Sequence, residues 1–183
     1  MGFEHQEEAE QFLTELKDRF AQFGLELHPE KTRVLAFGRK PAWTWRTRGG
    51  PKPGTFDFLG FTHSCGKTRK GKFIVRRQTM RKRMQAKLRE VKEELRRRMH
   101  HCVPEQGAYL RAVVGGYIRY HGVPLNARAI SAFRLGVMRL WRAILRRRSQ
   151  KHRLSRPRMV QLAERWLPPA RICHPYPWVR CVV

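Results

Sequence analysis

The sequence predicts an α+β fold, in which one helix and short antiparallel β-hairpins are followed by a bundle of helices. Two observations carry this prediction. In the first 75 residues, short apolar runs alternate with turn residues around the stretch 55–63, as they do in hairpins. From residue 78 onward, apolar residues recur every three or four positions, which is typical of amphipathic helices.

The charge balance of the chain also changes at the stretch 55–63. Residues 1–60 carry nine Lys/Arg and nine Asp/Glu, whereas residues 61–183 hold the whole formal excess of +26. A hydrophobic content of 41% is sufficient for a folded core, so the charge is not that of a disordered tail. A polyanion is therefore the expected partner, and nucleic acid is the most abundant polyanion in cells.

The part before residue 76 reads as one helix and several strands. Apolar spacing and Gly24 predict a helix over 7–23. Short strands are expected at 25–27 and 32–37. Three prolines and three glycines make 40–54 a loop, whose Trp43 and Trp45 could stack on bases or dock on a protein surface. A hairpin follows, from 56–62 through a basic turn at 66–71 to 73–75.

The remaining chain reads as helical. One apolar stripe runs from Met80 to Met99, and Pro104 opens a second helix that ends at Gly122. Asn126 is expected to cap a third helix, which makes a small antiparallel bundle. Ser155 is expected to cap a last short helix, and the segment after it is extended.

Little in the sequence points to catalysis or to a metal. The glycine before Gly66-Lys67-Thr68 is one residue too far away for a phosphate-binding loop. The Cys/His groups lack the tight spacing of structural zinc sites, so we interpret the four cysteines as reduced thiols of an intracellular protein. Two-metal phosphoryl transfer needs clustered carboxylates, and the chain has two aspartates, Asp18 and Asp57. We therefore assign no catalytic residue, no metal site and no cofactor to this chain.

Several motifs occur in the order found in one family. The stretches 24–32 (GLELHPEKT) and 56–61 (FDFLGF) resemble the late palm motifs of bacterial group II intron reverse transcriptases. The stretches 78–83, 116–126 and 145–150 resemble the maturase-specific thumb of the same family, and 166–169 with 174–175 resemble its C-terminal segment. The loop 40–54 falls outside the resemblance. The similarity implies a palm remnant over 1–75, a helical thumb over 76–150 and a basic C-terminal helix with an extended tail over 151–183.

The resemblance also implies roles for individual residues. Lys31 corresponds to a residue near the phosphates of the incoming nucleotide, and Phe58, Leu59 and Gly60 correspond to the primer grip. In the family, the catalytic aspartate pair lies just upstream of a Gly-Phe-Glu-His stretch, which here is Gly2 to His5. We therefore expect this chain alone to be inactive as an RNA-directed DNA polymerase, although the complete enzyme uses Mg²⁺.

Charge and resemblance together predict an RNA-binding protein of the bacterial cytoplasm that binds group II intron RNA and assists splicing. The alternatives are half of a split reverse transcriptase, completed by a partner chain with fingers and palm that binds a primer–template, and a general basic nucleic-acid or membrane-surface protein. We expect no membrane association. The candidate RNA-binding residues are Arg76, Arg77, Arg81, Lys82, Arg83, Lys87, Arg146, Arg147 and Arg148.

Overall fold

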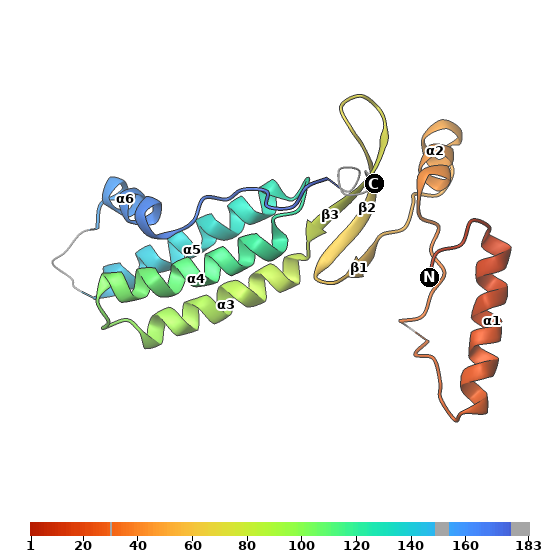
Figure 1. Cartoon of the computed structure of the whole chain (residues 1–183), viewed down its shortest axis with the longest axis horizontal. Coiled ribbons are helices and arrows are strands. Elements are labelled where there is room, and N and C mark those ends of the chain that lie inside the picture. The colour runs from red at the N-terminus through yellow and green to blue at the C-terminus, as the bar shows by residue number, and fades with distance from the viewer. Residues whose placement is uncertain (30, 149–153, 177–183) are drawn as a thin grey trace. The chain divides into compact units, whose positions relative to one another are not determined.

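The computed structural model of the chain has a mixed α+β fold, as the sequence predicts (Figure 1). It describes residues 1–29, 31–148 and 154–176, so Cys181 and the end of the motif at 145–150 lie outside the described residues. The described chain forms two compact units. The first unit comprises 1–56 and 64–75, and the helical unit comprises 57–63 and the residues from 76 onward.

Helix α1 (Gln6–Gln22) confirms the first predicted helix. It ends before Gly24, which adopts a left-handed conformation with φ +67°. No residue of α1 is buried, and Phe23 beyond its end is 73% exposed. The apolar side of this helix therefore contributes little to a core in the first unit.

The two short strands predicted after α1 are wrong. Residues 25–27 and 32–37 contain no strand. The second segment is extended, and the amide of Gly54 donates to the carbonyl of Ala36 over 2.9 Å, but no ladder of hydrogen bonds develops. Alternating apolar residues give a strand only where a neighbouring strand accepts and donates along its length.

The prediction of a loop over 40–54 is also wrong, because helix α2 (Arg39–Arg48) occupies most of it. Pro41 lies in the first turn of this helix, where a missing amide hydrogen costs nothing. Gly49 ends the helix in the left-handed conformation, with φ +66°. The remaining glycines and prolines follow the helix, so these residues frame α2 and do not interrupt it.

The sheet has the order β1-β2-β3, with β1 at Phe56–Phe58, β2 at Phe61–Lys67 and β3 at Phe73–Thr79. The predicted basic turn joins β2 to β3. It is closed by hydrogen bonds from the amide of Thr68 to the carbonyl of Lys72 and from the amide of Gly71 to the carbonyl of Thr68. The predicted strand at 73–75 is confirmed as part of β3. The predicted strand over 56–62 is wrong as one element, because a turn at Leu59 and Gly60 divides it into β1 and the start of β2.

The helical unit contains α3 (Arg81–Arg97), α4 (Val103–His121), α5 (Ala127–Arg147) and α6 (Arg156–Trp166). Helices α3, α4 and α5 run side by side as the predicted antiparallel bundle (Figure 1). Ser155 caps α6 as predicted, by accepting from the amide of Arg158. Among the described residues, the apolar side chains with no exposed surface all lie here: Val91, Leu95, Leu110, Val114, Ile130, Phe133, Val137 and Trp141.

A buried asparagine joins the sheet to the bundle. Asn126 is the N-cap residue of α5, as predicted, but its side chain makes no capping hydrogen bond. Its Oδ1 accepts from the amide of Thr79 over 3.0 Å, and its Nδ2 donates to Thr79 Oγ1 and to the carbonyl of His121. Thr79 at the end of β3 and His121 at the end of α4 thus take up the hydrogen bonds of this side chain in the interior, in place of the first turn of α5.

A buried glutamine performs the same task at the other end of the bundle. Gln106 is fully buried, and its Nε2 donates to the carbonyl of Arg98 over 2.7 Å, at the end of α3. Its Oε1 accepts from the indole of Trp141 over 2.8 Å. The glutamine therefore ties α3, α4 and α5 together where the carbonyls of α3 lack helical partners.

Helix α6 packs against α4 and α5. Trp166 lies directly over Gly107, where an added Cβ would be 2.3 Å from the indole ring. The guanidinium of Arg134 donates to the carbonyls of Ala163, Leu167 and Pro168 at the end of α6. A cation at this end also complements the helix dipole. Among the described residues, none of the helices combines the length and apolarity that a membrane crossing demands.

We expect Asn126→Ala to destabilise the helical unit by about 1–3 kcal/mol, because it leaves the buried amide of Thr79 without an acceptor. Thermal and urea unfolding followed by circular dichroism would measure the change. Ser131→Ala, at an exposed position of the same helix, is the control and should change stability little. Equal stability of the two variants would contradict the role given to Asn126.

Candidate nucleic-acid interface

The hairpin turn between β1 and β2 is strained and exposed. Its two central residues, Leu59 and Gly60, have φ of +47° and +78°, which is the pattern of a type I′ turn. A glycine adopts this conformation freely, but a leucine does so at a cost. Phe58 and Leu59 are nevertheless 58% and 66% exposed, so the turn presents apolar side chains to solvent.

Helix α4 and the start of α3 hold this turn in place. The hydroxyl of Tyr120 donates to the carbonyl of Leu59 over 2.8 Å, and the amide of Met80 donates to the carbonyl of Gly60 over 3.0 Å. The ring of Phe61 stacks on Tyr120 with 5.8 Å between centroids. The surrounding bonds thus fix a conformation that the turn sequence alone would not favour.

The residues to which the resemblance gives palm roles fall in different units. Lys31 is exposed in the first unit, in a turn where its amide donates to the carbonyl of His28. Phe58, Leu59 and Gly60 belong to the helical unit.

Basic side chains form rows along α3 and α5. Residues seven or eleven apart on a helix differ in direction by only about 20°. Lys82, Arg89 and Arg96 therefore share one direction on α3, and Arg81 and Lys92 share a neighbouring one. On α5, Arg128, Arg139 and Arg146 form a third row. All eight are exposed, and together they are called the basic face: Arg81, Lys82, Arg89, Lys92, Arg96, Arg128, Arg139 and Arg146.

The two helices that carry the basic face are neighbours and run parallel. Both begin at the Thr79–Asn126 contact. Midway along them, Leu88 packs so closely on Gly136 that an added Cβ would lie 3.0 Å from Leu88 Cδ2. On α3, Arg81 and Lys92 lie next to Leu88, which is the residue that packs on α5. The basic rows of α3 and α5 therefore lie on one surface of the bundle. Helix α5 contains no Asp or Glu.

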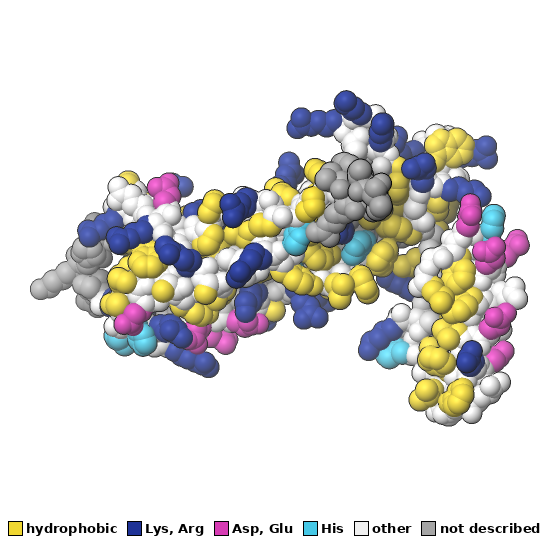
Figure 2. Space-filling model, viewed as in Figure 1, with side chains coloured by type: hydrophobic (Ala, Val, Ile, Leu, Met, Phe, Trp, Pro, Cys, Tyr) yellow, Lys and Arg dark blue, Asp and Glu magenta, His cyan; other side chains and the backbone are white. Residues whose placement is uncertain are grey.

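Two of the three acids of α3 pair with basic side chains of the same helix. Glu90 pairs with Lys87 at 2.7 Å, and Glu94 pairs with Arg98 at 2.6 Å and with Arg97 at 3.5 Å. Figure 2 shows acidic side chains interspersed with basic ones over α3. Within the described chain, the eight cations of the basic face form no ion pair, although Glu93 lies beside them on α3.

The structure distributes the predicted RNA-binding residues unevenly. Arg76 and Arg77 lie on β3, and Arg81, Lys82 and Arg83 are exposed at the start of α3. Lys87 points to the acidic side of α3. Arg146, Arg147 and Arg148 are exposed at the far end of α5, where Arg148 also donates to the carbonyl of His100.

The two predicted basic clusters are thus separated by the length of a 21-residue helix, which is about 30 Å. The residues that connect them are ones that the sequence reading missed: Arg89, Lys92, Arg96, Arg128 and Arg139. Their spacing of seven or eleven residues along a helix is the sequence signal that could have identified them as parts of one face.

No carboxylate cluster accompanies the basic face. Across the part of the chain that the structure describes, no group of three or more His, Cys, Asp or Glu side chains could hold a metal ion. The described residues therefore do not fit the Mg²⁺ site that the resemblance implies for the complete enzyme. Cys65, Cys102 and Cys173 are free thiols.

A buried histidine packs next to the turn between β1 and β2, against the ring of Phe61 that follows it. His121 packs against Phe61 and Tyr117, with ring centroids 5.1 and 4.3 Å away, and its Nδ1 lies 3.3 Å from Thr79 Oγ1. Burial lowers the pKa of His121 from its usual value. Burial also raises the pKa of Tyr117 to about 12, although the neighbouring Thr79 side chain acts to lower it.

Comparison of the chain with protein-family models, with curated proteins and with solved structures yields no match.

The lowered pKa of His121 predicts a pH-dependent stability. Above about pH 6.5 the histidine is neutral in both states, and its packing contributes fully. As the pH falls below 6.5, the unfolded state takes up the proton first, so stability decreases until the folded pKa is passed. We expect the melting temperature to fall from pH 7 to pH 5, and His121→Gln to flatten this fall. His100→Gln, at an exposed position, should leave the slope unchanged. Identical slopes in all three proteins would contradict the assignment.

Proposed function

We propose that the chain is an RNA-binding part of a bacterial group II intron reverse transcriptase and maturase, and that its basic face binds the phosphate backbone of structured intron RNA. The observation that carries the proposal is the alignment, along two adjacent parallel helices, of eight exposed cations that form no ion pair with any residue the structure describes. The intron family itself rests on the motif resemblance. The proposal places the protein's work in the bacterial cytoplasm.

The arrangement suits a structured RNA better than a base sequence. Lysine and arginine side chains in rows can follow phosphates at a repeat of about 10 Å for every seven helical residues. An A-form helix offers phosphates and 2′-hydroxyls, and its deep major groove hides the base edges from side chains. Recognition by shape and charge is therefore the expected mode, with little reading of sequence.

The strained turn adds a second element to the proposal. Phe58 and Leu59 are held outward by Tyr120 and Met80, which supports a role in contacting a nucleic-acid backbone, as the resemblance to a primer grip implies. A turn that is fixed before binding loses little entropy on binding.

We expect Arg89→Gln combined with Arg96→Gln to weaken binding to a structured intron RNA. Each lost phosphate contact should reduce the dependence of log affinity on log salt by about 0.7–0.9, so the double variant should lose roughly 1.5 units of slope. Filter binding between 50 and 300 mM KCl, about the range in which such effects are large, would measure it.

The matched control is Lys87→Gln combined with Arg97→Gln. It removes the same charge from the same helix, but from side chains that pair with Glu90 and Glu94. Its salt slope should stay close to that of the unmodified protein. An equal loss in both variants would indicate a general effect of net charge. Equal affinity of the unmodified protein for structured RNA and for a charge-matched polyanion would also contradict the proposal.

Catalysis by the purified chain alone is not expected. A primer, an RNA template, Mg²⁺ and deoxynucleotides should give no extension product, because the described residues offer no carboxylate cluster to hold two metal ions. A gel-based extension assay would measure this. Extension that persists through stringent purification would contradict it, whereas extension on adding a second chain with fingers and palm would favour the split enzyme.

A further inference from the structure

Charge is segregated within the first unit. All of its Asp and Glu residues precede residue 31, whereas 31–56 carries seven Lys/Arg and none of either acid. The other part of this unit, 64–75, also lacks acids. Helix α2 lies in the middle of this acid-free sequence, and its basic residues are Arg39, Lys40, Arg46 and Arg48.

Two tryptophans of α2 combine exposure with basic neighbours. Trp43 is 54% exposed, and the guanidinium carbon of Arg48 lies 5.4 Å from its ring centroid. Trp45 is 38% exposed, with the guanidinium of Arg46 at 5.8 Å. Figure 2 shows apolar surface over α2 bordered by basic side chains.

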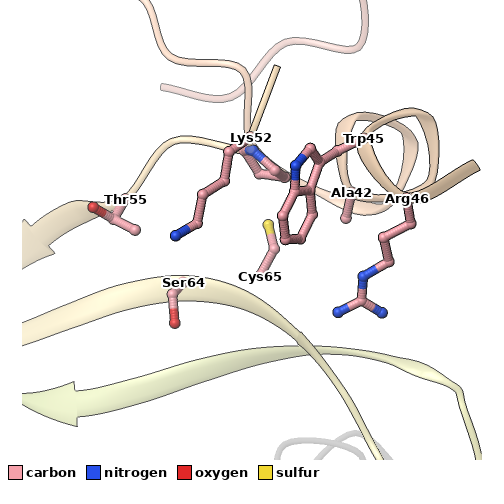
Figure 3. A pocket seen from close by; sticks show the side chains of 8 residues that line it. Ala42, Trp45, Arg46, Lys52, Thr55, Ser64 and Cys65 are labelled. Carbon is pink, nitrogen blue, oxygen red and sulfur yellow. The ribbon is translucent and has the colours of Figure 1, made fainter. Parts of the chain in front are cut away.

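The opposite side of α2 is anchored. Ala42 is buried, and with Trp45 and Arg46 it lines a small pocket whose other wall includes Ser64 and Cys65 of β2 (Figure 3). The amide of Gly38, just before α2, lies 3.4 Å from the Cys65 thiol. Trp43 is not part of this pocket, so the packing that fixes the helix leaves its ring on the outer side.

The basic turn between β2 and β3 belongs to the same unit as α2. It begins two residues after Cys65, which contacts the start of α2. Its basic residues are Lys67, Arg69, Lys70 and Lys72. Trp43 therefore lies in a unit in which the basic residues of α2 and of the turn belong to segments that contain no Asp or Glu.

From these observations we propose that α2 is a binding site for unpaired nucleotides of single-stranded RNA. The indole of Trp43 stacks on one base, so that the base, Trp43 and the Arg48 guanidinium form one stack. Arg39 and Lys40 contact the neighbouring phosphates. The inference rests on the proposed function for the choice of RNA, and it adds a site that is separate from the basic face.

Charge favours RNA over a protein as the occupant. A protein-docking surface of this size would need contiguous apolar side chains at its centre, whereas the exposed aromatic ring here is flanked by cations. Stacking on an aromatic side chain tolerates any base, and surrounding cations follow the strand between bases. Duplex RNA offers no free base face, so the site selects unpaired nucleotides.

The test uses the full chain and a fluorescein-labelled 12-nucleotide oligouridine, with a blunt RNA duplex of the same length as the second probe. Trp43→Ala should weaken oligouridine binding by about tenfold, the effect of losing one stacked base. Trp43→Phe should recover most of the affinity. Duplex binding should be unchanged in both variants. Phe23→Ala, which removes an exposed aromatic ring near acidic α1, is the matched control and should change neither probe.

Three results would overturn the inference: no binding of oligouridine by the unmodified protein, unchanged affinity of Trp43→Ala, or an equal loss on the duplex. An oligothymidine probe tests the choice of RNA, since a Trp43 effect on DNA alone would overturn it. The Arg89→Gln, Arg96→Gln variant separates the two proposals. If it binds structured RNA normally while Trp43→Ala loses oligouridine, the basic face is wrong and the α2 site stands.

Discussion

The side chain of Asn126 is the constraint on which the helical unit depends. It satisfies both polar groups of Thr79 and the last carbonyl of α4 at His121. Through Thr79, the end of β3 and the start of α3 are fixed against the turn between α4 and α5. Because Met80 and Tyr120 then bind the carbonyls of the hairpin turn, the strained Leu59 conformation depends on the same junction. A buried amide fits this task, because it offers a donor and an acceptor a short distance apart.

The junction also makes the basic face possible. Helices α3 and α5 begin at the same contact and run parallel, and Gly136 lets Leu88 approach closely, so rows of arginine on two helices border one surface. Ion pairs with Glu90 and Glu94 occupy the cations on the other side of α3. Exposed cations without partners repel one another and reduce stability. The bundle tolerates them because it has a fully buried apolar core and because the buried side-chain amides of Asn126 and Gln106 hydrogen-bond its helices to neighbouring segments.

The first unit has a much smaller buried core than the helical unit. Its α1 buries no residue, and Ala42 of α2 is its one buried hydrophobic side chain among the described residues outside proline and glycine. The sequence predicts a loop where α2 forms, because proline and glycine commonly interrupt a helix, but Pro41 and Gly49 stand at positions that helix ends favour. For Trp43 the sequence leaves both base stacking and protein docking open, whereas the structure shows an exposed ring on an anchored helix whose charged residues are all basic.

The sequence by itself determined the α+β class, the four helices of the helical unit, the hairpin with its basic turn and the excess of positive charge. These follow from local periodicity, from Gly24, Gly71 and Ser155 at element ends, and from composition. Only the tertiary structure decided that Lys87 is paired with an acid, that Asn126 serves Thr79 in place of its own helix, and that Arg89 and Arg139 belong to one face. It also decided that 32–37 forms no strand. The physical reason is the same in each case. A strand, a buried hydrogen bond or a shared surface depends on which other residues lie next to it in the folded chain, and the periodicity of a segment does not predict those neighbours.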